Sequence, residues 1–552
     1  FPLQAQLPGA AFHTYTLHYA KGDDFSPESY APLRKVFSTM NSIGNVQFQS
    51  SRGRSSDAYL PFFNMQTDSY GVIGALGWTG DWQMDIGRSG NAVKLVGGMK
   101  KTRFFLYPQE KVRTPRILLM EWQGELEESY NTWRRFLLRH YSPLEADQTH
   151  LKMPVCYLNW GEVSCQEQIR RAQEAIDKGF EYEVFWIDAG WYGSAQVKEN
   201  STVFDGVWGT QSGNWWPNQG LFPDGMKPLS DFLRKHNKEL LIWFQPEIAS
   251  GGSELAQKHP DWLLGGGLVN LGNPEALQGI IDMVAGQMIE TGATWYRQDF
   301  NMDPAWAWQA ADQPDRTGIT EMKHIEGLYT FWDELKKRVP NLKIDNCASG
   351  GRRIDLEMIL RSAVLWRTDY PFEVKDLCDL QSHMFGLSYW VPLQQTSLGV
   401  SDRDLFRGAM GAGMTLSNWD GKMVIDGFVP QVREYQEIRD YFYGDYYPLI
   451  PYSPGKDSWT AWQFHDRDKN AGVAVFVRKP ESNIITLQAN LRKINREKRY
   501  EVKLTIRSEP PSVTRIPGEE LAGLAVELKE KRDSAVLVYK MITAQPVAAT
   551  KP

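Results

Sequence analysis

The sequence predicts a multidomain protein in which a (β/α)8 TIM barrel lies between an incomplete N-terminal β-sandwich and a C-terminal antiparallel β-sandwich. Its 552 residues are too many for one hydrophobic core, since single cores stop growing near roughly 250–300 residues. Short β-type segments give way near Met153 to alternating strand and helix patterns, and they return after Tyr452. We therefore predict domains at residues 1–145, 146–452 and 453–552.

The N-terminal domain is predicted from short β-type segments separated by Gly, Ser and Pro, such as Tyr70–Trp78 and Thr102–Tyr107. A helical pattern over Glu127–Arg139 links this domain to the next. The sandwich is short, as if its first half lay on a missing segment. The chain opens at Phe1 without an initiator Met, so we expect a processed or trimmed product.

The central domain is predicted from apolar strands that alternate with amphipathic helices, the pattern of βα units. The helices include Cys165–Lys178, Lys227–His236, Pro274–Glu290 and Gly327–Arg338. A doubly wound open sheet would need a glycine-rich phosphate turn after an early strand, and the sequence has none. We expect the strands of a closed barrel at Val155–Trp160, Glu183–Asp188, Leu240–Gln245, Thr294–Asp299, Lys343–Cys347, Val364–Asp369, Ser388–Pro392 and Ala412–Ser417.

The C-terminal domain is predicted from a second group of β-type segments, followed by a polar end that we expect to be frayed. The expected strands are Ala461–Phe464, Gly472–Arg478, Asn483–Gln488, Arg499–Leu504 and Ala535–Tyr539.

Composition argues against several classes of partner. A net charge of −6 gives no basic field for nucleic acid, and no apolar run approaches the roughly 20 residues that span a bilayer. Four cysteines and nine histidines show no metal-ligand spacing, so we predict no metal site and no cofactor. Cys156 and Cys165 either pair across a loop or remain free thiols. A secreted, periplasmic or cytoplasmic location and a homo-oligomer all stay open.

Two aspartates mark the ends of predicted barrel strands. Asp299 follows Trp295–Gln298, and Asp369 follows Val364–Thr368. A parallel barrel presents its chemistry at the C-terminal ends of its strands, and a pair of carboxylates is the basic equipment for cutting a glycosidic bond. The alternatives are a helix cap or a turn. We interpret the two aspartates as a catalytic pair.

Other predicted strand ends carry side chains suited to a sugar. Arg297 projects to the same side of its strand as Asp299, where a cation would keep that carboxylate ionised; a surface ion pair is the alternative. Asp188, with Trp191 after it, ends the second strand, and sugar hydroxyls would supply the donors that a buried carboxylate needs. Glu247 follows the third strand, where a structural salt bridge explains it nearly as well.

Two loops complete the predicted pocket. The small-residue loop Asn346–Arg353 follows the fifth strand and suits close approach of backbone to ligand. The chain holds 21 Trp, an excess that fits sugar stacking and core packing equally well. Trp208, Trp215 and Trp216 lie in the long loop after the second strand, and we expect them to form a wall of the pocket.

These segments resemble glycoside hydrolase family 36, the α-galactosidases that share a clan with families 27 and 31. The ordered run of Leu221–Leu229, Leu241–Glu247 and Lys258–Leu263 carries the resemblance, which is densest from about Met153 to Asp420. It implies a (β/α)8 barrel enzyme that removes a terminal α-linked sugar with retention of configuration.

The resemblance also implies roles for individual residues. The nucleophile of a Lys-x-Asp-x-Asn strand end is met by Asp299, with Asn301 in place and Arg297 standing in for the lysine. The acid/base of a Trp-x-x-Asp pattern is met by Asp369, three residues after Trp366. A Cys-x-Ser-Gly-Gly-x-Arg loop near the 2-position of the sugar is met by Cys347, Ser349, Gly350, Gly351 and Arg353. The residues expected to bind the sugar are Asp188, Trp191, Trp243, Arg297, Asn301, Cys347, Gly350, Arg353 and Trp366.

Two departures from the family pattern bear on specificity. The family carries two adjacent aspartates before Gly-Trp to hold the 4- and 6-hydroxyls of galactose, whereas here Asp188 is followed by Ala189. Gln245 replaces a family Glu and removes a second negative charge. Loss of a charged acceptor opens space for a differently decorated sugar.

We therefore expect a retaining exo-acting α-glycosidase of α-galactosidase type, working by double displacement through a covalent glycosyl-aspartate. Its substrate would be an oligosaccharide or glycoconjugate with a terminal α-linked sugar. The alternatives are an α-N-acetylgalactosaminidase or related α-glycosidase, a transglycosidase, and a carbohydrate-binding protein without catalysis.

Overall fold

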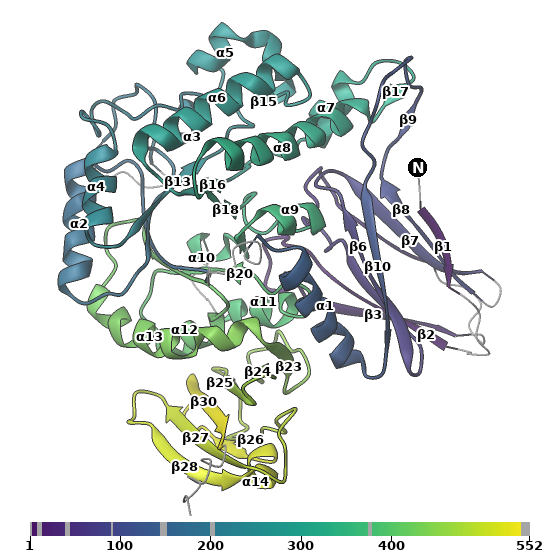
Figure 1. Cartoon of the computed structure of the whole chain (residues 1–552), viewed down its shortest axis with the longest axis vertical. Helices are drawn as coiled ribbons and strands as arrows, with labels where there is room; N and C mark the ends of the chain where they lie inside the picture. The colour runs from purple at the N-terminus through teal and green to yellow at the C-terminus, as the bar shows by residue number, and fades with distance from the viewer. Residues whose placement is uncertain are drawn as a thin grey trace, which may run out of the picture.

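The computed structural model describes residues 3–7, 14–38, 45–89, 92–143, 152–198, 205–373 and 378–542. The expected fraying after residue 542 and the opening at Phe1 lie outside the described residues. Figure 1 shows N-terminal sheets beside a central barrel and a separate C-terminal sheet. The predicted fold class, a TIM barrel between two antiparallel β domains, is confirmed.

The N-terminal domain consists of two antiparallel sheets. Apolar side chains from both, including Leu17, Phe63, Trp82 and Ile86, share one buried core, so the sheets pack as a sandwich. One sheet has the order β1 (Leu3–Leu7), β8 (Ala92–Met99), β7 (Trp82–Ser89) and β4 (Val46–Gln49). The other has the order β10 (Arg116–Gln123), β6 (Tyr70–Gly77), β5 (Phe62–Gln66), β2 (Thr14–Ala20) and β3 (Pro32–Ser38).

Helix α1 (Leu126–His140) follows the sandwich, where the sequence predicts a linking helix. A short antiparallel pairing between β9 (Arg103–Phe104) and β17 (Arg316–Thr317) connects the segment after the sandwich to the barrel at a second place.

The central strands are parallel and follow one another around the barrel. Their order is β11 (Val155–Asn159), β12 (Val184–Ile187), β13 (Glu239–Phe244), β16 (Trp295–Gln298), β18 (Lys343–Asn346), β19 (Val364–Trp366), β20 (Gln394–Gln395), then β21 (Ser397–Leu398) and β22 (Met414–Asn418), which returns to β11. β20 pairs with β19 and β21 pairs with β22, so the two short strands together occupy the seventh barrel position.

The predicted seventh strand, Ser388–Pro392, is wrong. These residues follow α11 (Asp379–Leu387) in a turn, and the seventh position is taken by β20 and β21 instead. Trp390 from this apolar run stacks on Phe62 of the N-terminal sandwich, with ring centroids 6.0 Å apart. The run is apolar because it is buried at a domain interface, which periodicity alone cannot distinguish from a strand.

Helices cover the outside of the barrel (Figure 1). They are α2 (Cys165–Asp177), α4 (Lys227–Lys235), α6 (Pro274–Thr291), α8 (Ile319–Arg338), α9 (Leu356–Arg361), α11, α12 (Arg403–Ala409) and α13 (Ile425–Ile438). Ser164 caps α2 by accepting a hydrogen bond from the Glu167 amide, and Gly292 ends α6 in the left-handed region. The predicted helix Gly327–Arg338 is the second part of α8.

Short elements lie in the loops that follow the C-terminal ends of the barrel strands. They are α3 (Trp208–Gln211), α5 (Glu254–Lys258), α7 (Ala305–Ala311), α10 (Tyr370–Glu373), the strand pair β14 (Leu263–Leu264) and β15 (Leu268–Val269), and the 3-10 turns Pro260–Trp262 and Gly265–Gly267.

The C-terminal domain begins after the 3-10 turn Arg439–Tyr443. Its main antiparallel sheet has the order β23 (Asp445–Pro448), β24 (Trp459–Asp466), β25 (Ala471–Arg478), β30 (Asp533–Met541), β27 (Arg499–Ile506) and β28 (Ser512–Pro517). A second, two-stranded sheet joins β26 (Thr486–Gln488) to β29 (Ala525–Glu527), and α14 (Gly518–Ala522) lies before β29. Arg407 of α12 donates to the Ser534 carbonyl, 3.0 Å away, which fastens this domain to the barrel.

All four cysteines are free and buried, so Cys156 and Cys165 do not pair. Within the described ranges, no helix has both the length and the apolar character to cross a membrane.

We expect Trp133→Ala to destabilise the junction of α1 with the barrel. Trp133 is fully buried, contacts Phe62 and donates its indole N–H to the Trp390 carbonyl at 3.1 Å. Loss of so large a core side chain costs about 3–5 kcal/mol. Urea unfolding should show an earlier midpoint, whereas Trp306→Ala, at a ring that is 53% exposed, should leave it nearly unchanged. Equal midpoints for the two variants would contradict this account.

Candidate active site

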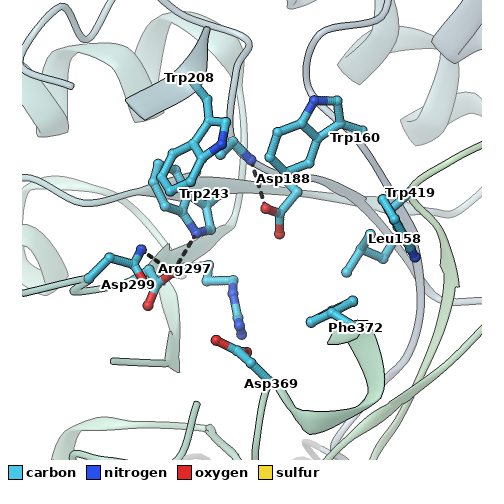
Figure 2. Close-up of a pocket in the computed structure, with 12 residues that line it drawn as sticks. Leu158, Trp160, Asp188, Trp208, Trp243, Arg297, Asp299, Asp369, Phe372 and Trp419 are labelled. Carbon is cyan, nitrogen blue, oxygen red and sulfur yellow. Dashed lines mark hydrogen bonds between the residues drawn. The ribbon is translucent and has the colours of Figure 1, made fainter. Parts of the chain in front are cut away.

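A cavity of about 190 Å³ opens among the loops that follow the barrel strands. Figure 2 shows the carboxyl groups of Asp188, Asp299 and Asp369 turned toward it, with Leu158, Phe372 and Trp419 on the side away from Asp299. The lining residues lie in the last part of β11, β13 and β16 or in the loops after β11, β12, β16, β19 and β22, as expected for a parallel barrel. They are Leu158, Trp160, Asp188, Ala189, Trp208, Trp243, Arg297, Asp299, Asn301, Asp369, Phe372 and Trp419.

Asp299 lies directly after β16 and its carboxylate is held by four donors. The amides of Phe300 and Ser349 donate to Oδ1, both at 2.8 Å, while Asn301 Nδ2 at 2.8 Å and Trp243 Nε1 at 3.3 Å donate to Oδ2. Burial by itself opposes ionisation, but Arg297 and these donors outweigh it and lower the pKa of Asp299. Asp299 is therefore held as a carboxylate.

Asp369 has a different environment. Its Oδ1 accepts a hydrogen bond from Trp366 Nε1 at 2.7 Å and lies 4.0 Å from the thiol of Cys347. Among the described residues, Oδ2 has no hydrogen-bond partner. Burial, followed by the negative charge of Asp299, raises the pKa of Asp369 well above that of an ordinary aspartate. Of the two carboxyl groups, Asp369 is therefore the one that holds its proton to higher pH.

Both catalytic candidates border one cavity and influence one another's ionisation. The Cys347 thiol lies between them, close to Asp369 Oδ1 and within hydrogen-bonding reach of Asp299. Two carboxyls whose surroundings drive their pKa values apart are the pattern of an acid and a base at one site.

Arg297 is the cation of the site. Its guanidinium lies 4.2 Å from the ring centroid of Trp186 and 4.4 Å from that of Trp366. Nη1 forms an ion pair with Asp345 Oδ1 at 2.6 Å, on the neighbouring strand β18. The side chain is only 3% exposed, so the surface ion pair considered as an alternative is wrong.

Asp188 follows β12 at the upper edge of the cavity in Figure 2. Trp186 Nε1 donates to its Oδ2 and the Ala189 amide to its Oδ1, both at 2.9 Å. Burial, partly offset by Arg297, raises the pKa of Asp188 to about 6. Its carboxyl group borders the cavity, where it can bond a ligand hydroxyl.

Trp243 presents its indole N–H to Asp299 because aromatic neighbours fix the ring. Tyr192 stacks on it with an interplanar angle of 6°, and Trp208 meets it edge-on at 5.9 Å. Trp191 donates its own indole N–H to the Trp243 carbonyl at 2.9 Å. These contacts restrict the rotation of Trp243, so its indole N–H stays directed at Asp299.

Comparisons with known proteins find relatives of this chain. The family described as Melibiase matches residues 145–402, a span that contains both aspartates. α-Galactosidase Mel36A of Lactobacillus acidophilus is 22% identical over 82% of this chain and 64% of its own length. Probable α-galactosidase C of Aspergillus flavus is 26% identical over 63% of this chain and 47% of its own length.

Solved structures share the fold. A variant of the family 36 α-galactosidase AgaA of Geobacillus stearothermophilus, in complex with stachyose, superposes with a TM-score of 0.81 at 19% identity and covers 98% of this chain and 76% of its own. An α-galactosidase of Lactobacillus brevis gives 0.80 at 22% identity, over 98% and 75%. Residues 145–402 of this chain are thus similar to the Melibiase family, and its fold is that of the family 36 α-galactosidases. The chain covers less than two thirds of the length of Mel36A.

Five residues expected to contact the sugar lie behind the residues that line the cavity. Cys347 and Trp366 contact Asp369, and Trp191 supports Trp243. Gly350 lies in the loop beneath Asp299 and Asp369, and Arg353 is 1% exposed. These five are not among the residues that line the cavity, and their expected contact with a sugar stays a prediction.

Arg353 is one of these five. Its two terminal nitrogens bind the two oxygens of Glu247, at 2.5 and 3.0 Å, and His324 approaches the same carboxylate at 3.0 Å. Burial opposes ionisation of Glu247, but Arg353 and His324 overcome it and lower its pKa to about 2. The alternative reading of Glu247 as a structural salt bridge is therefore the right one.

Several lining residues were missed by sequence reasoning. Trp160 and Trp419 come directly after β11 and β22, and the rule applied to Asp188 and Asp299 finds them when it is applied to every strand end. Asp345 was missed although a buried Arg in a strand requires a counter-ion on a neighbouring strand. Of the three loop tryptophans, Trp208 lines the cavity, whereas Trp215 and Trp216 are not among its lining residues.

We expect Trp243→Phe to raise the pKa of Asp299, because it deletes one donor to the ionised form and keeps the ring. The acidic limb of the kcat/KM profile should move to higher pH by up to about one unit. Any nitrophenyl α-glycoside that the protein hydrolyses serves as the substrate.

Trp215→Phe is the matched control. Trp215 packs against Trp243 and is fully buried, but its indole N–H has no hydrogen-bond partner among the described residues. This variant should therefore leave the acidic limb in place. If both variants move the limb equally, packing rather than the hydrogen bond sets the ionisation of Asp299.

Proposed function

We propose that the protein is a retaining exo-acting α-glycosidase of α-galactosidase type. The observation that carries the proposal is that two carboxyl groups at one cavity have pKa values shifted in opposite directions: Arg297 and four donors lower the pKa of Asp299, whereas burial and the charge of Asp299 raise the pKa of Asp369. An anion and an acid on either side of a sugar are what double displacement requires.

In the proposed reaction, Asp299 attacks the anomeric carbon of the terminal sugar while Asp369 donates its proton to the departing oxygen. The product of this step is a glycosyl ester on Asp299. Asp369, now a carboxylate, removes a proton from water, which attacks the anomeric carbon and releases Asp299. Asp188 is available to bind a hydroxyl of the same sugar.

The exo mode and the substrate class have separate support. The cavity is about 190 Å³ and is walled by Trp160, Trp208, Phe372 and Trp419, a size that suits one sugar ring at the end of a chain. The structural relative AgaA has been solved with raffinose and with stachyose bound. We propose oligosaccharides or glycoconjugates with a terminal α-linked sugar as the substrates of this chain.

We expect Asp299→Ala to abolish turnover and Asp369→Ala to act selectively. Without its acid, the enzyme should lose about 10²–10⁴-fold in kcat/KM on raffinose and far less on dinitrophenyl α-galactoside, whose leaving group needs no proton. Added azide should restore turnover in both variants. The glycosyl azide from Asp299→Ala should have inverted configuration and that from Asp369→Ala retained configuration, as NMR of the products would reveal.

The azide products also test the assignment. A glycosyl azide of inverted configuration from Asp369→Ala would mean that Asp369 is the nucleophile and Asp299 the acid/base. Circular dichroism must first establish that both variants fold. If wild-type protein binds raffinose but hydrolyses no α-glycoside, the chain is a carbohydrate-binding protein and the proposal fails.

One observation favours a second candidate, an α-glycosidase with a different sugar preference such as an α-N-acetylgalactosaminidase. Ala189 lines the cavity with Leu158 and Trp160, so this part of the wall offers a methyl group where a carboxylate would bind a hydroxyl. A sugar with an apolar or bulkier substituent would fit such a wall better than a fully hydroxylated one.

We expect Ala189→Asp to change the ranking of sugars. In a panel of nitrophenyl α-glycosides, the variant should gain on α-galactoside relative to α-N-acetylgalactosaminide, because a carboxylate accepts a hydroxyl and crowds a larger group. A shift of at least tenfold in the ratio of kcat/KM values corresponds to about 1.4 kcal/mol. An unchanged ratio would mean that Ala189 does not face the variable part of the sugar.

A further inference from the structure

The twelve residues that line the cavity all belong to the barrel. The N-terminal sandwich nevertheless reaches the loops on which the catalytic pair depends. A segment between β2 and β3, residues 21–31, packs beneath Cys347–Arg353 and against Arg367–Thr368. It is closed on itself by Tyr30 N donating to the Gly22 carbonyl at 3.1 Å.

Asp23 is the centre of this contact. It is fully buried, and its Oδ2 accepts the Gly351 amide at 2.8 Å. Oδ1 accepts the Thr368 hydroxyl at 3.1 Å and the Ser29 hydroxyl at 3.1 Å, as well as the Phe25 amide at 3.2 Å. One carboxylate thus joins the loop after β18 to the loop after β19.

Residues 21–31 explain why positions 350 and 351, in the loop after β18, are glycines. Gly350 has φ +93°, and a β-carbon there would collide with Asp23 Oδ2. A β-carbon on Gly351 would collide with the hydroxyl of Tyr30, which itself donates to the Arg367 carbonyl. Backbone without side chains is needed here because the N-terminal sandwich occupies the space.

One of the two loops carries a hydrogen-bond donor to Asp299, and the other carries Asp369. Ser349, adjacent to Gly350, has φ 51° and donates its amide to Asp299 Oδ1 at 2.8 Å. Thr368 directly precedes Asp369 and accepts the Tyr370 amide at 3.1 Å. A displacement of either loop would therefore move a donor of Asp299 or Asp369 itself.

We propose that Asp23 of the N-terminal sandwich is a positioning residue of the catalytic pair, which fixes Asp299 and Asp369 relative to each other through Gly351 and Thr368. The inference rests on the proposed function, since it concerns how the two carboxyls act on a glycoside. It assigns the sandwich a part in catalysis although none of its residues lines the cavity.

Besides its hydrogen bonds to the two loops, Asp23 contributes a negative charge that raises the pKa of Asp369. The groups that face Asp369 are Asp299 and Arg297 from β16, Cys347 from the loop after β18, and Asp23 from the sandwich. Burial and Asp299 contribute most to the raised pKa of Asp369, Arg297 and Trp366 oppose them, and Asp23 adds to the rise. Asp23 itself is faced by Arg352, whose Nε donates to its carbonyl at 3.1 Å.

The test compares wild type with Asp23→Asn and Thr368→Val. Asparagine has one acceptor oxygen, so it cannot hold both loops, and it carries no charge; valine removes the Thr368 hydroxyl while leaving Asp23 intact. We expect kcat on raffinose to fall at least tenfold in both variants, with KM changed less than threefold. The loss on dinitrophenyl α-galactoside should be smaller, because that substrate needs no proton from Asp369.

The pH profile separates positioning from general damage. Removing the negative charge at Asp23 lowers the pKa of Asp369, so the alkaline limb of kcat/KM should move to lower pH in Asp23→Asn. Thr368→Ser restores the hydroxyl and should restore kcat.

Asp81→Asn is the matched control. Asp81 is a buried carboxylate of the same sandwich that accepts from Ser50 and from the Gly53 amide, both at 2.9 Å, and it contacts neither catalytic loop. It should lower the unfolding midpoint while leaving the alkaline limb and the leaving-group dependence unchanged.

The inference is overturned if folded Asp23→Asn and Thr368→Val keep wild-type kcat and pH profile, or if Asp81→Asn reproduces their effects. If Asp23→Asn does not fold, Thr368→Val and Thr368→Ser decide the question alone. If the wild-type protein hydrolyses no α-glycoside, both the proposed function and this inference are refuted. If the wild type is active and Asp23→Asn and Thr368→Val behave like it, only this inference is refuted.

Discussion

One buried cation organises the face of the barrel at which the proposed catalytic carboxyls lie. Arg297 lies between two indole rings and has the carboxyl groups of Asp188, Asp299, Asp345 and Asp369 around it. A guanidinium does not lose its proton near neutral pH, so the acids around it compete for a single positive charge. Asp345 forms a direct ion pair with Arg297. Asp299 is stabilised as an anion both by the charge of Arg297 and by four hydrogen bonds. Asp369 has fewer donors, and the pKa values of the two proposed catalytic carboxyls are therefore shifted in opposite directions.

The arrangement depends on two layers of support beneath the cavity. Aromatic rings fix the indole N–H groups of Trp243 and Trp366 that point at the carboxyls. Below them, the ion pair of Glu247 with Arg353 holds the loop after β18 from the barrel side, and Asp23 holds it from the N-terminal sandwich. Buried ionic groups of this kind contribute little net stability but specify one geometry, which is what a pair of catalytic carboxyls needs.

Much of the barrel could be predicted from the sequence. The strands that end before Asp188, Asp299 and Asp369 were expected within one to three residues of their observed ends, because alternating β and α periods are local properties of the chain. The exception is informative: Ser388–Pro392 is apolar because Trp390 contacts Phe62 of another domain. A buried turn at an interface and a buried strand look the same in a local pattern of apolar residues.

The sequence by itself determined which side chains stand at the strand ends, and hence that carboxylates and tryptophans gather at one face of the barrel. Only the tertiary structure decided which of them touch. That Arg297 pairs with Asp345 depends on the register between neighbouring strands, and that Asp23 reaches Thr368 joins residues 345 positions apart. Such contacts depend on how domains pack, and packing distances are not encoded in any local periodicity of the chain.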